Sequence, residues 1–471
     1  MGEECIAQYQ AHRGAYFADY SGYVPQLVKA PKMVWKDPGG YGKFGWSGPA
    51  RVSFQIESSY NNGRLQRAPQ AVRAAAWRLG FVVLGLALGL CVAEPLLRLL
   101  DLGRPGLYTY DRDRGWVLRP NARGWQDKEG KAYVMVNSAG LRDREHPERK
   151  PPHTLRIAIL GDSFTEAKQV PLEQTFCAVI ERRLKSCPAL AGRDVETLNF
   201  GVDSYGTAQE LMTLRRQAWK FSPDVVVLAV CTGNDIRNDS IELEGDKCQP
   251  FFTYRDGELV LSGAFEESAW FRFQCAARFE SRRSATLNVL GQLHRAMWVR
   301  MRSHIVKFHE PRASELGLDD SIYKAPKHHA EREAWEVAEG ELEMVHQEAM
   351  EHGARFLVVT LSNGIQVYPD PTQRRAYMHR LGVDNLFYPD LRIRALGERK
   401  GFAVLNLAPP FQDYADRHHV FLHGFSNTQL GTGHLNQEGH RYGGELIARR
   451  LCELLKEPAP RHAVRQADAE K

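Results

Sequence analysis

A serine early in the chain and a histidine far downstream have the residue types that acyl transfer requires. Ser163 follows the apolar run Leu155–Leu160 in LRIAILGDSFT, and His434 lies in GHLNQEGH. A serine hydroxyl becomes an effective nucleophile only when a base takes its proton, and histidine titrates in the right range. An apolar run that stops at Gly-Asp-Ser is typical of a buried parallel strand. It would place the hydroxyl at the carboxyl edge of a sheet, where open α/β proteins bind ligands.

Two segments between this serine and this histidine could stabilise negative charge. Val195–Phe200 and Asp224–Val230 are apolar runs that we expect to form strands, and they lead to Gly201 and Asn234. The backbone N–H of Gly201 and the side-chain amide of Asn234 could join the N–H of Ser163 in donating to a tetrahedral oxyanion. Loss of one such donor typically raises the barrier by about 2.7–4 kcal/mol.

The order Ser, Gly, Asn, His in these four blocks resembles the SGNH/GDSL hydrolase superfamily, and in particular its membrane-anchored bacterial-type members. The resemblance covers roughly Thr154 to Lys456 in scattered blocks. It implies a serine esterase that works through a covalent acyl-enzyme and needs neither a cofactor nor a metal. Carried over by position, it implies Ser163 as nucleophile, Gly201 and Asn234 as oxyanion donors, and His434 as base.

One position departs from the family pattern. The family usually carries an aspartate three residues before the histidine, where it orients the imidazole, and this chain has Gly431 there. A backbone carbonyl, or an acid from elsewhere such as Asp413 or Asp416, would then have to hold the ring. Because an orienting carboxylate can change the rate by orders of magnitude, three outcomes are open: a dyad, a relocated acid or a weakened enzyme.

Helical and strand patterns alternate through this region, as a parallel sheet requires. Apolar stripes at helical spacing follow the serine, glycine and histidine blocks, and Asn436 is placed to cap the last of these helices. Ala354–Leu361 and Phe402–Leu407 are expected strands, separated by a helical stretch around Leu391–Lys400. We therefore predict an α/β fold, a doubly wound and mostly parallel sheet of about five strands flanked by helices, preceded by a transmembrane helix.

A long apolar segment precedes this domain. Leu79–Ala93 contains no charged residue, and Ala74–Leu97 reaches the ~20 residues of a spanning helix if Arg78 and Glu94 extend toward the interfaces. A core helix would show a polar face, and a cleaved signal peptide would need a better site than Glu94-Pro95. We predict a transmembrane signal-anchor helix within residues 70–100.

The charges that flank this segment predict its orientation. Arginines cluster before it, whereas the basic residues directly after it are offset by acids. The positive-inside rule then puts the N-terminal side in the cytoplasm and the catalytic domain outside the cell membrane, in the periplasm or the extracellular space. The residues concerned are Arg64, Arg67, Arg73 and Arg78 before the segment, and Glu94, Arg98, Asp101 and Arg104 after it.

The remaining chain divides by its patterns. Residues 1–69 form an N-terminal extension without sustained periodicity, which fits a disordered tail or a start codon placed too far upstream. Residues 101–152 resemble a β-rich collar, and residues 153–456 form the hydrolase-like domain with an insertion at about 240–330. The insertion is rich in aromatic residues, which favours an accessory hydrophobic core over a substrate-binding lid. Residues 457–471 are expected to be disordered.

Composition and motifs exclude several classes of protein. With 471 residues, 43% of them hydrophobic, and a formal net charge of +5, the chain can bury a large core but has no strongly basic surface for nucleic acid. No Walker loop, HExxH or paired CxxC is present. The histidines between His418 and His440 offer a competing metal chemistry, but they lack the regular spacing of a ligand set.

The chain contains eight cysteines, which permit disulfides in an extracytoplasmic domain. Cys248 and Cys275 lie in one irregular segment and are the expected pair. Cys177, Cys231 and Cys452 fall on helical or strand patterns, so we expect them to be small buried hydrophobic residues.

These features predict a membrane-anchored serine esterase that acts on an O-acyl ester, for example an acetyl ester. Its substrate would be a small acyl ester or an acylated glycan or lipid at the cell surface. Two alternatives stay open: an O-acyltransferase that uses the same residues, and a non-catalytic accessory subunit that assists a membrane acyltransferase in glycan acylation.

Overall fold

A five-stranded parallel sheet forms the centre of the molecule, as the sequence predicts. The computed structural model describes residues 70–457 except 101, 103–105, 191, 263–267 and 306–318. The strand order is β11-β10-β7-β5-β6, and neighbouring strands pair in parallel. The strands are β5 (Thr154–Gly161), β6 (Asp194–Asn199), β7 (Val225–Cys231), β10 (Arg355–Leu361) and β11 (Ala403–Asn406).

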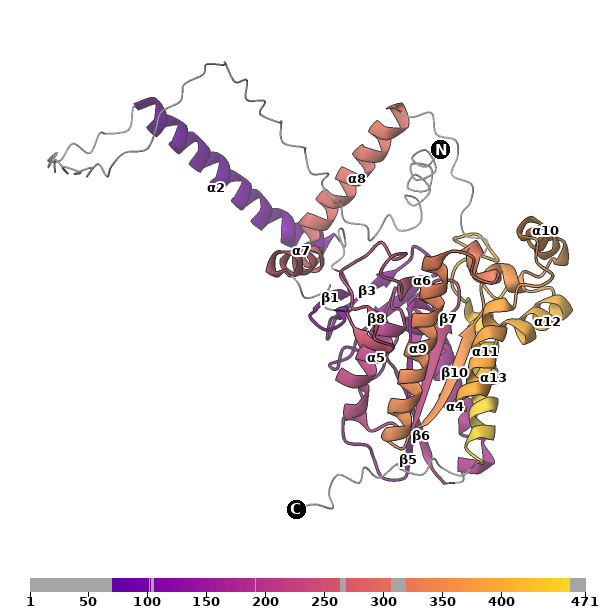
Figure 1. Ribbon diagram of the computed structural model, residues 1–471. Coiled ribbons are helices and arrows are strands. Elements are labelled where there is room, and N and C mark those ends of the chain that lie inside the picture. Colours follow the sequence, from indigo (N-terminus) through magenta and orange to yellow (C-terminus); the bar gives the residue numbers. More distant parts are fainter. Residues whose placement is uncertain are drawn as a thin grey trace, which may run out of the picture. The chain divides into compact units, whose positions relative to one another are not determined.

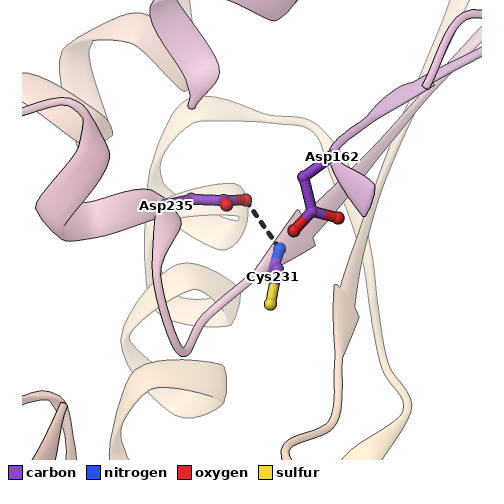
Figure 2. A group of neighbouring side chains, drawn as sticks. All are labelled: Asp162, Cys231 and Asp235. Carbon is purple, nitrogen blue, oxygen red and sulfur yellow. Dashed lines mark hydrogen bonds between the residues drawn. The ribbon is translucent and has the colours of Figure 1, made fainter. Parts of the chain in front are cut away.

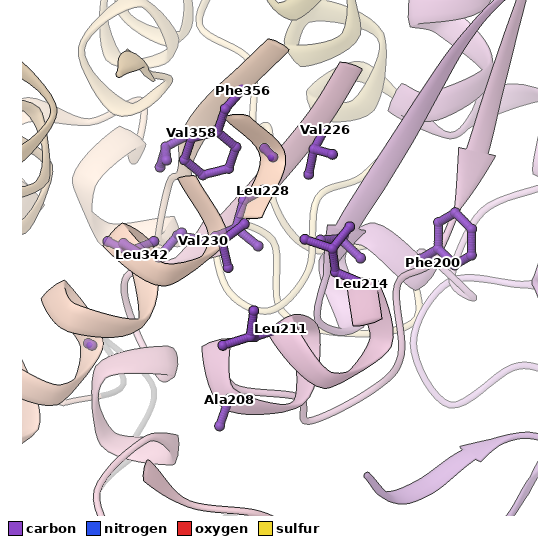
Figure 3. Packing of buried hydrophobic residues seen from close by; sticks show 14 of the residues in the cluster. Phe200, Ala208, Leu211, Leu214, Val226, Leu228, Val230, Leu342, Phe356 and Val358 are labelled. Atoms are coloured by element: carbon purple, nitrogen blue, oxygen red, sulfur yellow. The ribbon is translucent and has the colours of Figure 1, made fainter. Parts of the chain in front are cut away.

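Alternate residues of the strands feed two separate hydrophobic cores, one on each face of the sheet. In β7, Val226 and Leu228 belong to one core, whereas Val225 and Val227 belong to the other. This period of two is what a strand buried on both faces requires. Figure 3 shows the first core, in which Leu211 and Leu342 pack against the strands.

Helices cover both faces of the sheet and make the doubly wound architecture (Figure 1). Three helices pack on one face, namely α5 (Thr207–Arg216), α9 (His329–Glu351) and α11 (Tyr388–Lys400). Three others pack on the opposite face, namely α4 (Phe176–Leu184), α12 (Ala408–His418) and α13 (Gln437–Leu454). Asn436 caps α13 by accepting a hydrogen bond from the Gly439 N–H at 3.0 Å, which confirms the predicted cap.

Shorter elements complete the domain. The helices are α3 (Ser163–Glu166), α6 (Asp235–Asn238), α7 (Ala269–Glu280), α8 (Ala285–Ile305) and α10 (Pro371–Leu381). The 3-10 turns are η2 (Leu172–Gln174), η3 (Pro188–Leu190), η4 (Ala218–Phe221), η6 (Ser281–Arg283), η7 (Asp320–Tyr323) and η8 (Gly364–Val367).

Short antiparallel hairpins lie before the sheet and in the insertion. The collar contains β1 (Tyr108–Asp111) paired with β2 (Gly115–Leu118), and β3 (Arg123–Gln126) paired with β4 (Ala132–Met135). The insertion contains β8 (Phe252–Arg255) paired with β9 (Glu258–Leu261). Its aromatic residues divide between two environments. Phe251 and Phe252 are buried, whereas Trp270 and Phe273 are exposed, so the insertion is only in part the expected accessory core.

The N-terminal apolar segment forms the helix α2 (Gln70–Leu99). Its part from Trp77 to Leu99 is long and apolar enough to cross a membrane, and none of its apolar window is buried. The helix up to Leu96 belongs to a compact unit of its own. The predictions for residues 1–69 and for the tail from 458 onward lie outside the described residues.

Within the described residues two disulfides form, one between cysteines 27 residues apart and one between cysteines 265 residues apart. Cys248 bonds to Cys275, which confirms the expected pair. Cys452 bonds to Cys187, so the prediction that Cys452 is a free buried residue is wrong. The bond joins the segment after α4 to α13, and the two helices pack against each other, which brings the sulfurs together. Cys177 and Cys231 are free and buried, as predicted.

Candidate active site

Ser163 and His434 meet at the carboxyl edge of the sheet, where the sequence places them. The Ser163 Oγ lies 2.9 Å from the His434 Nε2. The opposite ring nitrogen, Nδ1, lies 2.5 Å from the Glu129 Oε2. Since a carboxylate can only accept here, Nδ1 carries the hydrogen and the lone pair of Nε2 faces the serine hydroxyl. This is the arrangement of a nucleophile, a general base and an orienting acid.

The orienting acid comes from the collar, not from the hydrolase-like domain. Glu129 lies in the turn between β3 and β4, 305 residues before His434 in sequence. Its second oxygen accepts the backbone N–H of His434 at 2.7 Å, so that one carboxylate holds both the ring and the main chain. Gly433 makes room for it, because a Cβ at that position would lie 2.1 Å from Glu129 Oε1.

Asn427 holds this turn against the histidine loop. Its amide donates to the carbonyls of Asp127 at 2.9 Å and Gly130 at 3.0 Å. Its Oδ1 accepts the Gly130 N–H at 3.0 Å. One side chain therefore makes three hydrogen bonds to the backbone on both sides of Glu129, which fixes where the carboxylate can reach.

The prediction that Asp413 or Asp416 orients the histidine is wrong. Asp416 forms a two-pronged ion pair with Arg374, both contacts at 2.7 Å, and Asp413 pairs with Arg417 on the same helix. Gly431 also explains why the family position holds no acid. Its φ is +82°, and a Cβ there would lie 2.4 Å from the ring of Tyr368. An aspartate does not fit this loop, and the relocated acid takes over the role that the sequence left open.

The charges of Glu129 and His434 stabilise each other. Burial alone would raise the pKa of Glu129, but the charge and hydrogen bonds of His434 outweigh it and hold the pKa below its usual range. Burial alone would lower the pKa of His434, but Glu129 together with Asp203 and Asp162 outweighs it and raises the pKa above 6.5. The imidazolium that forms when the serine loses its proton is therefore favoured.

The turn after β5 fixes the position of the serine. Asp162 is completely buried and caps α3 by accepting the Phe164 N–H at 2.9 Å. Behind α3 the backbone of Gly201 comes very close, since a Cβ there would lie 2.4 Å from the Glu166 N. A residue with any side chain at 201 would push the serine turn away from the sheet edge.

The predicted oxyanion donors lie in this region, but they differ in their availability. The Gly201 N–H already donates to the Asn199 Oδ1 at 2.9 Å. The Asn234 Nδ2 donates to the Asp162 Oδ2 at 3.3 Å, and this leaves its second hydrogen for another acceptor. Among the described residues, no acceptor pairs with the backbone N–H of Ser163. The roles of Gly201 and Asn234 stay predictions, and Asn234 is the better placed of the two.

Several carboxyl groups are buried behind this site, and no cation is paired with them among the described residues. Asp162 and Asp235 lie on either side of Cys231, and the Cys231 N–H donates to Asp235 at 2.6 Å (Figure 2). Glu210 of α5 is buried, and neither of its oxygens has a hydrogen-bond partner within the described parts of the chain. Burial and the neighbouring carboxylates raise the pKa values of Glu210 and Asp235 far above the usual range.

The other C-terminal histidines do not gather into one ligand set. His423 is buried, its Nδ1 donates to the Gly433 carbonyl at 2.7 Å, and Ser362 contacts its Nε2 at 2.9 Å. His440 is buried against the ring of Phe176. Burial lowers the pKa of His423 to about 4 and that of His440 to about 3, so both are neutral parts of the fold.

Sequence reasoning missed Glu129 and Asn427. Both lie on turns without periodic pattern, and the contact between them depends on how the collar folds over the sheet. The one local signal is the glycine at 433, next to the catalytic candidate, which leaves space for an approaching group.

Comparison with known proteins gives only distant structural likeness. No family model matches the chain, and no curated protein matches it. An acetyl xylan esterase is similar in structure, with 15% identity, a TM-score of 0.33, and coverage of 63% of this chain and 100% of the other. A lipase/acylhydrolase from Enterococcus faecalis has 13% identity, a TM-score of 0.30, and coverage of 66% and 100%. A putative lipolytic protein of the G-D-S-L family from Desulfitobacterium hafniense has 12% identity, a TM-score of 0.29, and coverage of 62% and 98%. At these values the likeness by itself decides nothing about the chemistry, which has to be argued from the site.

Proposed function

We propose that the protein is a serine ester hydrolase that uses Ser163, His434 and Glu129 as a catalytic triad. The observation that carries this proposal is the continuous chain of contacts from Ser163 Oγ to His434 at 2.9 Å and from His434 to Glu129 at 2.5 Å. The similar structures include an acetyl xylan esterase and a lipase/acylhydrolase, which agrees with ester hydrolysis at this coarse level.

The proposed reaction proceeds in two halves. The Ser163 oxygen attacks the carbonyl carbon of the ester, its proton moves to His434 Nε2, and Glu129 balances the imidazolium charge. The tetrahedral intermediate collapses to an acyl-serine, and the leaving alcohol takes the proton from His434. Water then attacks the acyl-serine with His434 again as base, which releases the acid and restores the serine. During both attacks the oxyanion is held by the Ser163 N–H and the free hydrogen of Asn234.

The position of Glu129 argues against the alternative that the protein is a non-catalytic accessory subunit. That alternative depended on the missing aspartate at 431, and Glu129 supplies the carboxylate from the collar. An O-acyltransferase would use the same acyl-serine and differ only in the acceptor. Within this chemistry we propose an acetyl or other short acyl ester as the acyl donor and water as the acceptor.

A serine-reactive probe tests this proposal directly. The full chain should react with a fluorophosphonate and hydrolyse p-nitrophenyl acetate. Ser163→Ala should abolish both signals, a loss on the order of 10³-fold or more, because the nucleophile is gone. Ser186→Ala, which removes an exposed hydroxyl that donates to the Arg183 carbonyl at the end of α4, is the matched control and should retain full activity. Unchanged activity in folded Ser163→Ala protein would refute the proposal.

We further propose that α2 anchors the protein in the cell membrane with the catalytic domain outside the cytoplasm. The arginines before Leu79 support this orientation, and two disulfides in the domain fit an oxidising compartment. A reporter fused after Lys456 tests it. Alkaline phosphatase should be active at that position, and a reporter that fluoresces only in the cytoplasm should be dark. The reverse pattern would place the domain in the cytoplasm.

A further inference from the structure

Helices α7 and α8 expose large apolar side chains, of which Trp270 and Phe273 stack on each other with ring centroids 5.4 Å apart. Trp270 of α7 is 65% exposed, and Met297 of α8 is 60% exposed. A soluble surface seldom shows so many large apolar groups together, and such patches usually mark an interface. The full set is Trp270, Phe273, Leu287, Leu290, Leu293, Met297 and Trp298.

The exposed leucines of α8 and Met297 lie on one face of the helix. Leu287, Leu290 and Leu293 follow one another at intervals of three, and Met297 comes four residues later. At 3.6 residues per turn these positions form one apolar stripe. Gln292 falls on the opposite side of the helix and is exposed as well.

The same segment is strongly basic. Residues 269–305 contain seven arginines and a single acid, Glu280. By sequence the segment therefore carries six more positive than negative charges (seven arginines less one acid), which suits an anionic surface. A tryptophan-containing apolar stripe together with many arginines is the composition of a helix that lies in the plane of a membrane interface.

The junction between α7 and α8 is attached to the end of the candidate membrane span. The Arg98 guanidinium, one residue before the end of α2, donates to the Arg283 carbonyl at 2.9 Å. The Gly106 N–H donates to the Arg282 carbonyl at 2.8 Å. Arg98 belongs to the same compact unit as α7 and α8, so these bonds join η6 to the last residues of the candidate span and to the chain that follows it.

We propose that α7 and α8 lie on an anionic lipid bilayer and form a second membrane contact beside α2. The apolar stripe enters the boundary between headgroups and acyl chains, and the net positive charge of the segment attracts the phosphate groups. This proposal rests on α2 crossing the membrane and is independent of the esterase chemistry. It holds the domain at a fixed height and orientation over the lipid surface instead of leaving it to swing on a single helix.

Tryptophan quenching by brominated lipids tests the contact in the full chain. The protein is placed in nanodiscs of phosphatidylcholine with phosphatidylglycerol, with and without bromine on the acyl chains. Trp298→Phe should remove part of the quenched emission, because bromine quenches only indoles in contact with lipid. Trp77→Phe measures the contribution of α2, and Trp219→Phe, which replaces a side chain bonded to Glu348, should remove none.

Charge variants on the two sides of α8 make the test specific. Leu293→Glu should abolish most of the Trp298 quenching, because it places a negative charge in the stripe. Gln292→Glu adds the same charge to the opposite face and should leave the quenching nearly intact. Both positions are exposed, so neither variant threatens the fold. Omitting phosphatidylglycerol should weaken the Trp298 component and spare that of Trp77.

Two outcomes would overturn the proposal in distinguishable ways. Quenching of Trp77 without any quenching of Trp298 would show that α2 is inserted while α8 is not on lipid, which would assign the stripe to a protein partner or a second copy of the chain. Absence of quenching at both tryptophans would refute the membrane anchor itself. Hydrolysis of the soluble ester is measured in the same samples, so a failure of the catalytic proposal is seen separately.

Discussion

The acidic side chain Glu129 and a cluster of buried acids have pKa values that are shifted in opposite directions. Glu129 contacts His434 and has a lowered pKa, because the imidazole outweighs its burial. Glu210, Asp235 and Glu341 are completely enclosed, and burial together with mutual repulsion raises their pKa values well above the usual range. The difference shows that a partner of opposite charge, rather than depth alone, decides whether an acid is ionised in this fold.

The two groups therefore serve different purposes. At Glu129 the contact with His434 favours the ionised form, as the proposed reaction requires. In the buried cluster on α5, α6 and α9, burial and repulsion favour the neutral form, and no cation pairs with these acids among the described residues. The pKa of Asp239 is intermediate. Burial raises it to about 7, and hydrogen bonds from Ala208 and Thr207 oppose the rise.

Removal of the charge at Glu129 is expected to have the largest effect. Glu129→Gln keeps the shape but loses the carboxylate, so kcat should fall by about 10² to 10⁴-fold, as for orienting acids elsewhere. The assay is hydrolysis of p-nitrophenyl acetate. Asp416→Asn is the matched control, because that acid pairs with Arg374 and does not touch the histidine; its kcat should stay within about twofold of the parent. Equal losses in the two variants would contradict the assignment of the orienter.

The second-largest effect on kcat is expected from a change at Asn427, which holds the turn that carries Glu129. Asn427→Ala removes three hydrogen bonds to the turn that carries Glu129. Each is worth about 0.5–1.5 kcal/mol, and part of that free energy serves to position the carboxylate, so kcat should fall by about tenfold. If Asn427 acts only through Glu129, the Asn427→Ala change should cost almost nothing in a Glu129→Gln background. Additive losses would show that it has a separate role.

The pH profile should separate the charge of Glu129 from its shape. His434 must be deprotonated to act as base, and its raised pKa means that kcat/KM should rise with pH to a midpoint above 6.5. In Glu129→Gln the midpoint should move to lower pH, because the main group that raises the pKa of His434 is gone. A residual activity with an unmoved midpoint would mean that another acid sets the pKa of the histidine.

The smallest effect is expected from a change at Glu210 in the buried acidic cluster, and it alters the melting temperature rather than the catalytic rate. The pKa of Glu210 is raised in the folded state, so ionisation of this carboxyl group favours the unfolded chain. The free energy of unfolding is therefore undiminished below the pKa of the unfolded chain, and it falls as the pH rises toward the pKa of the folded state. Glu210→Gln removes this loss. Its melting temperature should exceed that of the parent at pH 8 by a few degrees, equivalent to about 1 kcal/mol, and the advantage should vanish near pH 4. Greater stability of the parent at pH 8 would indicate that Glu210 is ionised and paired.

The sequence predicts the framework of the site because its parts are local. An apolar run that ends before Gly161, a cap at Asn436 and apolar stripes at helical spacing are each recognised within a few residues, and all appear in the structure. Glu129 could not be found this way. Its contact with His434 joins residues 305 positions apart, through a turn that has no pattern of its own. The exposed stripe of α8 is also hidden in sequence, because the same spacing would serve equally well in a buried helix.

The position of Glu129 in the collar has a consequence for how such a protein can be cut or recombined. The sheet begins at Thr154, so a fragment that starts there would contain the serine and the histidine but lack the acid. If Glu129 orients His434 as proposed, the collar between α2 and the sheet is more than a spacer, and exchanging it for an unrelated linker would remove the orienting acid as well. A collar of different length would keep this contact only if the turn between β3 and β4 still met the histidine loop.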